Sequence, residues 1–429
     1  MRVLLVHNRY RSAAPSGENR VVDTEHAALA ACGHQVMLFG RRSDEIESWP
    51  RLKKASLPVQ VVWSRQARHD LAAAIATFGP DVVHVHNTFP LLSSAVLYAC
   101  RDTAVPVVAT LHNYKLACAS GDFFRDGAVC HECARRLPGP AVRHGCYRDS
   151  RAATAPVAIA VSVHRRAWRS LVSAYICVSA AQRDLLAGLR LPSERVFVRH
   201  NLIPRAAAPG AVGEPAHAPA SAYQPGYGLA AAYQPGYGLA AVREPVVVYA
   251  GRLDEAKGAR VLMAGWDSYL RGAQDSTLRL VIAGAGPLAR EVATWAASRP
   301  SVEMAGQLDQ RQCAALMARA RGVLLPSAWE ETFGLVVVEA MAAGTPPIAS
   351  GHGSFPELIT PDVDGVLFTP GDPAALGRVL HDVDASPGRF ARYGAQARRT
   401  YERRFDPERS IEDLLSIYNY ARGHPLFIA

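Results

Sequence analysis

The feature that most constrains the fold of this chain is an alternation of short apolar runs with helix-compatible segments. The alternation is interrupted once, near the middle of the chain, and then continues. The runs are rich in Val, Ile and Leu and scarcely alternate with polar residues, which is typical of parallel strands covered on both faces. The first half contains six predicted strands, at 1–8, 34–40, 81–87, 106–113, 174–179 and 196–201. The second half contains five, at 245–251, 278–284, 302–306, 321–327 and 345–350. We therefore predict an α/β protein made of two α/β halves.

A stretch of different composition, roughly residues 205–243, separates the two halves. It contains the segment AYQPGYGLAA twice in tandem, at 222–231 and at 232–241. Two copies are too few for a solenoid, and the dominance of Pro, Gly and Ala favours a linker. A tyrosine-rich docking segment is the alternative.

This break sets the predicted domain boundaries. Residues 1–204 form an N-terminal domain, residues 244–407 a C-terminal domain, and residues 408–429 a final helix and tail. The apolar residues of the final helix are spaced on one face: Ile411, Leu414, Leu415, Ile417 and Tyr418. A single apolar stripe must be covered, so we expect this helix to pack back on the N-terminal domain.

Composition narrows the class of partner and compartment. The 429 residues carry 47 Lys and Arg against 38 Asp and Glu, a formal charge of +9 that suits a nucleotide, a nucleic acid or an acidic membrane surface. No apolar run reaches the roughly 18 residues of a membrane span, and the first apolar run is too short for a signal peptide. The eight cysteines do not resemble a secreted disulfide framework. We expect a cytoplasmic protein.

The segment WEETFGLVVVEAMAAG, residues 329–344, joins a predicted strand to a predicted helix. Such a loop lies at the carboxyl edge of a parallel sheet, where ligands of open α/β sheets bind. The amides of Phe333, Gly334 and Leu335 would lie at the helix N-terminus, which favours phosphate, and Thr332 is placed to cap the helix.

Three glutamates surround this predicted loop. Glu330 and Glu331 precede the helix, where acidic residues also occur simply because they favour the helix dipole. Glu339 follows three valines and precedes AMAA. A carboxylate in so apolar a helix is seldom an ordinary surface residue, and we expect it to bind a ligand.

A second loop, AGRLDEAKG at 250–258, follows the strand that opens the second half. Gly251 permits a turn of the backbone, and Arg252 and Lys257 are placed to reach one anion. A guanidinium fork and an ammonium charge together suit a diphosphate; two solvated surface cations are the alternative. A third loop, AGAGP with Gly284, is a weak signal on its own.

These motifs together resemble the retaining glycosyltransferases of family 4, which have the GT-B fold of two Rossmann-like domains facing a central cleft. The resemblance rests on Glu331-x7-Glu339, GRLDEAKG, AGAGP and SGHGSFPELI at 350–359. In the first half, Gly17 in HNRYRSAAPSGENR is similar to the family's diphosphate loop, although many relatives have adjacent glycines. His112 in TLHNY matches the family's donor-sugar histidine, with Asn113 where an acid is commoner.

The resemblance implies a role for each residue. Glu339 would bind the ribose of a nucleotide-diphosphate sugar, Glu331 the donor sugar, and His112 a sugar hydroxyl. Arg252 and Lys257 would stabilise the leaving diphosphate, so that no divalent metal or other cofactor is needed for catalysis. The transfer would retain the anomeric configuration. A glycoside phosphorylase and a noncatalytic nucleotide-sugar-binding subunit are the alternatives.

Four of the eight cysteines lie within one predicted insertion at about 115–150: Cys118, Cys130, Cys133 and Cys146. The CxxC pair is typical of half a zinc site, and the other two thiols complete a tetrahedral set. We expect a structural zinc ion, with His131 and His144 as substitute ligands. Reduced, partly buried thiols or a disulfide are the alternatives.

Eight arginines and a single acid, Asp149, occur between residues 135 and 169; the arginines are 135, 136, 143, 148, 151, 165, 166 and 169. The excess of positive charge suits an anionic membrane face or a phosphorylated acceptor, and a solvated basic face is the alternative.

Aromatic residues are not interleaved with these arginines as nucleic-acid binding would require, so no nucleic-acid partner is expected. The acceptor, a small molecule or a lipid-linked precursor, and the donor base, UDP or GDP among others, remain open.

Overall fold

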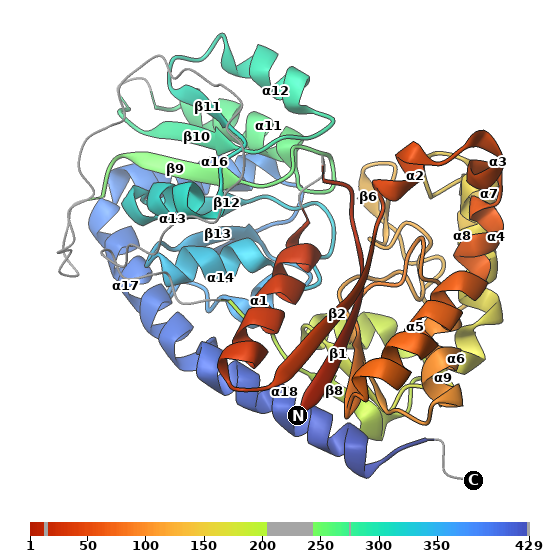
Figure 1. The fold of residues 1–429 in the computed structure, drawn as a ribbon. Helices are drawn as coiled ribbons and strands as arrows, with labels where there is room; N and C mark the ends of the chain where they lie inside the picture. Colours follow the sequence, from red (N-terminus) through yellow and green to blue (C-terminus); the bar gives the residue numbers. More distant parts are fainter. Residues whose placement is uncertain (13–15, 204–242, 274–275, 427–429) are drawn as a thin grey trace.

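The computed structural model describes residues 1–12, 16–203, 243–273 and 276–426. The chain forms two halves, each built on a six-stranded sheet with helices on both faces (Figure 1). The predicted linker and its tandem repeat lie almost entirely outside the described residues. No helix in the described part combines the length and the apolar character needed to cross a bilayer.

The N-terminal sheet has the strand order β2-β1-β3-β4-β7-β8, and every neighbouring pair is parallel. Its strands are β1 (Arg2–Arg9), β2 (Gln35–Arg42), β3 (Val82–Val85), β4 (Val107–Leu111), β7 (Ala174–Cys177) and β8 (Val196–Val198). All six predicted strands of the first half are confirmed. The sequence missed a short antiparallel hairpin, β5 (Phe124–Arg125) and β6 (Ala128–Val129), because two-residue strands leave no periodic pattern.

The C-terminal sheet has the order β11-β10-β9-β12-β13-β14 and is also parallel. Its strands are β9 (Val246–Ala250), β10 (Arg279–Ala283), β11 (Val302–Gly306), β12 (Gly322–Leu325), β13 (Pro347–Ser350) and β14 (Val366–Phe368). Five of them were predicted. The sixth, β14, is a three-residue edge strand that propensity alone does not separate from a loop.

Helices connect the strands of each sheet. The N-terminal half contains α1 (Gly17–Ala31), α2 (Glu45–Ser48), α3 (Arg51–Ala55), α4 (Leu57–Val62), α5 (Arg65–Phe78), α6 (Ala95–Asp102), α7 (Gly139–His144), α8 (Arg151–Val163), α9 (Arg165–Ser170) and α10 (Ala180–Leu185). The later helices are α11 (Ala259–Leu270), α12 (Ala289–Ala296), α13 (Gln310–Arg319), α14 (Leu335–Ala342), α15 (Phe355–Leu358), α16 (Pro373–Ala385), α17 (Pro387–Arg404) and α18 (Pro407–Gly423).

Strand β1 shows why both faces of the N-terminal sheet are covered. Leu4 and Val6 pack in a core with residues of α5 and α6, whereas Val3 and Leu5 pack in a core with residues of α1 and α18. Successive side chains of a strand point to opposite faces, so an unbroken apolar strand needs a helix layer on each side.

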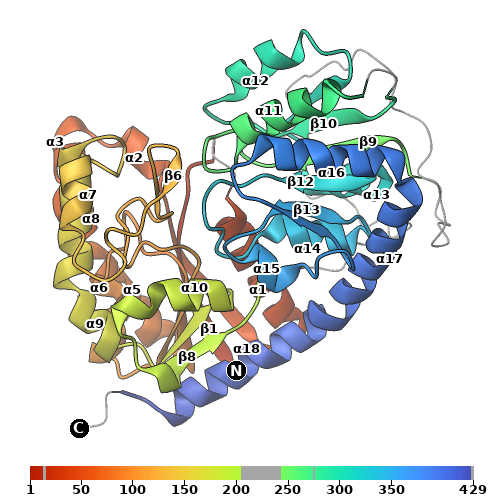
Figure 2. The same ribbon diagram turned by 180° about the vertical axis from the view of Figure 1, so that it is seen from behind.

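Helix α18 returns the chain from the C-terminal half to the N-terminal half (Figure 2). Its buried apolar face, formed by Ile411, Leu414, Ile417 and Tyr418, packs in the core that contains Val3 and Leu5. The N-terminal sheet is therefore completed by the last helix of the chain, and the two halves are tied by a second connection besides the segment around residues 204–242.

Candidate active site

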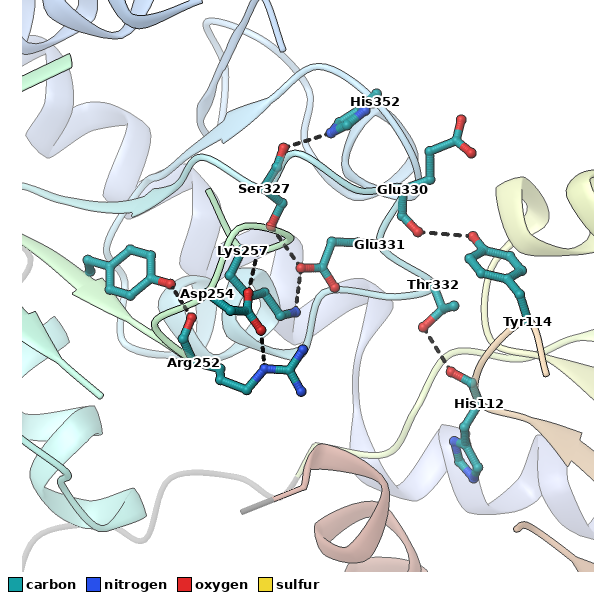
Figure 3. A network of polar contacts seen from close by, with 11 residues as sticks. His112, Tyr114, Arg252, Asp254, Lys257, Ser327, Glu330, Glu331, Thr332 and His352 are labelled. Carbon is teal, nitrogen blue, oxygen red and sulfur yellow. Dashed lines mark hydrogen bonds and ion pairs between the residues drawn. The ribbon is translucent and has the colours of Figure 1, made fainter. Parts of the chain in front are cut away.

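The loops after β9 and β12 bring the predicted cations and one glutamate together at the carboxyl edge of the C-terminal sheet (Figure 3). Nζ of Lys257 lies 2.5 Å from Oε1 of Glu331. The hydroxyl of Ser327 donates a 2.8 Å hydrogen bond to the same oxygen. Glu331 is thus neither a free surface carboxylate nor exposed, since its side chain is 8% accessible.

The environment of Glu331 keeps its carboxylate charged. Burial alone would raise the pKa of this group, but the charge of Lys257 and hydrogen bonds from Lys257 and Ser327 outweigh burial, so the pKa lies below its ordinary value. At neutral pH the Glu331 side chain is therefore an ionised hydrogen-bond acceptor at the sheet edge, and it has no proton to donate.

The loop at 250–258 holds Arg252 with its side chain outward. Its backbone carbonyl accepts a 2.7 Å hydrogen bond from the hydroxyl of Tyr249, while its guanidinium pairs with Asp254 and remains 61% exposed. Asp254 also accepts a 2.8 Å hydrogen bond from the amide of Lys257. One carboxylate therefore fixes the loop that carries both cations.

Glycines allow the loops of this edge to touch backbone to backbone. Gly284 has a φ of +155°, and a Cβ added there would lie 1.9 Å from the carbonyl oxygen of Gly251. Gly258, with a φ of +75°, would bring a Cβ to 1.8 Å from the carbonyl oxygen of Pro326. The AGAGP turn was a weak sequence signal, and in the structure it supports the loop that carries Arg252.

The segment SGHGSFPELI, residues 350–359, is hydrogen bonded to the loop that carries Glu331. Nε2 of His352 lies 2.8 Å from the carbonyl oxygen of Ser327, and the amide of Ser354 donates to the carbonyl of Glu331 at 3.1 Å. A Cβ at Gly353 would lie 2.7 Å from the nitrogen of Glu331. This predicted motif is thus a support for the neighbouring loop.

Helix α14 begins at the predicted loop, but its cap differs from the prediction. Gly334, with a φ of +82°, is the N-cap residue, so Thr332 does not cap the helix. The hydroxyl of Thr332 instead donates 2.9 Å to the backbone carbonyl of His112 in the other domain. The Phe333 side chain is 2% exposed and packs against aromatic rings, so only its backbone remains for a ligand.

The diphosphate loop predicted in the N-terminal domain faces the start of α14. Gly17 is the first residue of α1, and a Cβ added there would lie 2.7 Å from Cδ1 of Leu335. A larger residue at this position would require the Leu335 side chain to move. The two predicted phosphate-binding loops therefore meet at one place between the domains.

His112 follows β4 and lies buried between the domains. Its Nε2 and Nδ1 of His86 share a hydrogen bond of 2.9 Å, and the two rings stack with centroids 5.2 Å apart. Burial lowers the pKa of His112 to about 4, so the ring is neutral at physiological pH. A neutral imidazole can orient a hydroxyl without adding positive charge.

Two of the glutamates make contacts across the domains that the sequence did not indicate. Glu339 of α14 forms an ion pair with Arg20 of α1. Glu330, which precedes the helix, has its carboxylate 2.5 Å from Nε2 of His131, and its carbonyl accepts a 3.1 Å hydrogen bond from Tyr114. These partners are far apart in the sequence, and no local pattern could have paired them.

A buried polar network behind His112 was also missed. Nη1 of Arg199 donates 2.6 Å to Glu25, whose other oxygen lies 3.7 Å from Nε2 of His86. Nδ1 and Nε2 of His84 are hydrogen bonded to Tyr418 and to Thr110. The available sequence signal was HVHN, in which His84 lies on β3 and His86 directly follows it, two residues along the chain.

This network contains three potential metal ligands, Glu25, His84 and His86, with ligand atoms within 4.8 Å of one another. The donor set does not suit a cation. Arg199 pairs with Oε1 of Glu25, and both ring nitrogens of His84 have hydrogen-bond partners, so in this group only Oε2 of Glu25 and Nε2 of His86 are without a hydrogen-bond partner, and two atoms are too few for a metal site. We interpret the group as a buried ion pair beside two hydrogen-bonded histidines. His86 of this group is hydrogen bonded to the ring of His112 and so fixes its position.

The four cysteines of the predicted zinc site, Cys118, Cys130, Cys133 and Cys146, all line one small cavity in the insertion. The substitute ligands, His131 and His144, do not line it. Among the described side chains, the group just discussed is the one with three ligand atoms within 4.8 Å. The sulfur atoms thus surround the cavity without reaching that separation, and zinc binding stays a prediction.

Two Rossmann-like domains whose strand ends meet across these loops form the GT-B fold. Residues 15–206 match the family model described as Glycosyltransferase Family 4, and residues 244–383 match the model described as Glycosyl transferases group 1. The two models together span most of the chain. The protein therefore belongs to the family 4, group 1 glycosyltransferases, as the motifs suggested.

The relatives of the chain agree with this assignment. It is 26% identical to the glycogen synthase of Mycobacterium tuberculosis over 95% of this chain and 91% of that protein. It is 33% identical to the phosphatidyl-myo-inositol mannosyltransferase of Mycobacterium leprae over 36% of this chain and 42% of that protein. The fold is similar to that of Anabaena Alr3699/HepE, solved with UDP and glucose, with a TM-score of 0.64, 17% identity, and 98% and 99% of the two chains covered.

Proposed function

We propose that this glycosyltransferase moves a sugar from a nucleotide-diphosphate sugar to an acceptor hydroxyl with retention of the anomeric configuration. The observation that carries the proposal is that the loop holding the Lys257–Glu331 pair is joined to the backbone of His112 across the boundary of the two domains. The 2.9 Å hydrogen bond from Thr332 to the His112 carbonyl joins the two sides. The reacting centre would lie between them.

The leaving diphosphate would be stabilised by Arg252 and Lys257. The Arg252 guanidinium is exposed and Lys257 is only partly buried, so both charges can be offered to phosphate oxygens. The amides of Gly334 and Leu335 at the start of α14 would add donors aimed at developing charge. Two cations and a helix N-terminus supply the stabilisation that a divalent metal would give, and we propose catalysis without one.

The sugar would be held by Glu331 and His112, and the ribose by Glu339. Glu331 is engaged by Lys257 and Ser327, which favours a role as acceptor of sugar hydroxyl hydrogen bonds over that of an attacking nucleophile. Without a protein nucleophile, retention requires the acceptor to approach on the face from which the diphosphate departs.

The decisive experiment supplies the full-length protein with UDP, GDP and dTDP sugars and measures the nucleoside diphosphate released, with and without candidate acceptors. The anomeric configuration of the product is read by NMR. Release of diphosphate and a retained product support the proposal. An inverted product, or sugar phosphate formed from orthophosphate, would overturn it. Nucleotide binding without turnover for every donor and acceptor would indicate the noncatalytic subunit.

We further propose that the acceptor is lipid-linked and lies at an anionic membrane surface. Helices α3, α4 and α8 lie along the outer edge of the N-terminal domain (Figure 1). Leu52 and Val59 are 89% and 69% exposed, and Val163 on the neighbouring α8 is 63% exposed. Arg51, Lys53 and Lys54 flank the exposed leucine. Exposed apolar side chains framed by basic ones suit an anionic bilayer better than a small soluble acceptor.

Sedimentation with vesicles tests this surface. We expect the protein to bind vesicles containing phosphatidylglycerol, to bind pure phosphatidylcholine weakly, and to lose binding in the variant Leu52→Asp/Val59→Asp. Val363→Asp is the matched control, because Val363 is also exposed but lies in the other domain. Equal binding by the double variant and the control would reject the proposal.

A further inference from the structure

The insertion between β4 and β7 gathers four thiols from three separate places. Cys118 precedes the β5–β6 hairpin, Cys130 and Cys133 lie in the turn after it, and Cys146 follows α7. All four line a single cavity of about 10 Å³, which is room for about one water-sized sphere. Each is a free thiol in the structure.

Regular secondary structure is sparse around the β5–β6 hairpin. The hairpin strands have two residues each, and much of the segment around them is turn. Cys118 and Cys133 belong to two different small apolar clusters. Small irregular segments that cannot build a core of their own commonly use a metal cross-link instead.

The surroundings of the cavity suit a negatively charged metal centre. Four thiolates around one Zn²⁺ carry a net charge of about −2, which neighbouring donors must offset. Arg125 lines the cavity and is fixed by a 3.0 Å contact with Glu132. A guanidinium is thus next to the sulfur atoms.

We propose that Cys118, Cys130, Cys133 and Cys146 bind one Zn²⁺ in a closed, structural site. Soft thiolates in a tetrahedral set select zinc over hard cations. Zinc–sulfur bonds of about 2.3 Å hold the sulfur atoms about 3.8 Å apart, so binding contracts the cavity. The site lies outside the machinery of glycosyl transfer and goes beyond the proposed function.

The metal would fix one contact between the domains. His131 lies between the two cysteines of the CxxC pair, and its Nε2 lies 2.5 Å from Glu330 of the C-terminal domain. Glu330 directly precedes Glu331. A cross-linked CxxC turn therefore holds the insertion against the loop that carries the proposed sugar-binding carboxylate.

The experiment is metal analysis of the purified full-length protein. We expect about one zinc per chain, reduced by at least half in Cys118→Ser, Cys130→Ser, Cys133→Ser and Cys146→Ser. Cys32→Ser and Cys313→Ser are matched controls outside the cavity and should keep the metal. Chelation of the wild-type protein should lower the melting temperature, because a structural metal contributes to folding free energy.

Cobalt replacement keeps the test independent of the folding of the variants. After exchange, Co²⁺ bound by four thiolates should give thiolate-to-metal charge-transfer bands and the visible bands of a tetrahedral site. Less than about half an equivalent of zinc in the wild-type protein would overturn the proposal. Zinc retained by all four serine variants, a different metal in the site, or disulfides between these cysteines would overturn it equally. None of these readouts depends on transferase activity.

Discussion

Nζ of Lys257 and Oε1 of Glu331 lie 2.5 Å apart, so a cation proposed for the diphosphate is held by the carboxylate proposed for the sugar. The carboxylate is 8% exposed and the ammonium 29% exposed. The pair therefore positions two parts of the proposed donor site with respect to each other. Substituting one residue of the pair should have a different effect on stability from substituting both.

Lys257→Met should abolish transfer and also destabilise the protein. The variant leaves a nearly buried carboxylate without its cation, which can cost up to about 3 kcal/mol. The double variant Lys257→Met/Glu331→Gln removes the unpaired charge, so its urea midpoint should recover while activity stays at least roughly 100-fold down. Arg260→Ala, an exposed arginine of the same domain, is the control. Recovery of activity in the double variant would contradict the assignment.

Acid should destabilise the protein already below about pH 6.5. Burial lowers the pKa of His7 to about 4, and the pKa of His84 and His86 lies well below the ordinary value. Between about pH 4 and 6.5 the unfolded chain binds protons that the folded chain does not, so the free energy of unfolding falls as pH falls.

The variant His7→Gln tests the contribution of His7 to this pH dependence of the free energy of unfolding. His7→Gln keeps a polar partner for Asn19 but cannot titrate, so the slope of unfolding free energy against pH should become shallower by up to about 1.4 kcal/mol per unit. His69→Gln is the control, because His69 is 81% exposed. Urea unfolding at several pH values measures the slopes, and identical slopes for wild type and His7→Gln would refute the expectation.

Removing one partner of the buried ion pair of Arg199 with Glu25 should strongly destabilise the N-terminal domain. Both side chains are nearly inaccessible, at 4% and 1%. Arg199→Met leaves the buried carboxylate of Glu25 without its cation and should lower the free energy of unfolding by about 3–5 kcal/mol. The double variant Arg199→Met/Glu25→Leu should recover much of that loss. Chemical denaturation decides the point. A double variant no more stable than Arg199→Met would show that the network, rather than the unpaired charge, carries the effect.

The ion pair of Arg20 with Glu339 gives a prediction for nucleotide binding. If Glu339 holds the ribose, its carboxylate must leave Arg20, whose side chain is 45% exposed. A pair this exposed is worth at most about 1 kcal/mol, so Arg20→Met should tighten nucleotide binding by up to about fivefold. Glu339→Gln should weaken it. Calorimetric titration with UDP and GDP provides the measurement, and weaker binding by Arg20→Met would show that Arg20 itself contacts the nucleotide.

The sequence predicted the elements of the fold because local chemistry decides them. Eleven apolar runs were recognised, and each became a parallel strand; the strands it missed, such as β14, are too short to show a period. Motif spacing also selected Arg252, Lys257 and Glu331, which come together in space because strand ends of parallel sheets share an edge.

What the sequence could not supply are the partners across the domains. Thr332 looks like a helix cap in its local sequence, yet its hydroxyl donates to the carbonyl of His112, more than two hundred residues away. Glu330 looks like a surface residue and instead meets His131. No local periodicity encodes such pairs.

The sequence alone thus determined two α/β domains and the residue types at the edge of each sheet, since hydrophobic period and glycine placement act over a few residues. Only the tertiary structure decided which side chains are buried and charged together: Lys257 with Glu331, Arg199 with Glu25, and Arg20 with Glu339. The physical reason is that burial and Coulomb attraction depend on distance in space, which is set when α18 and the two sheets pack.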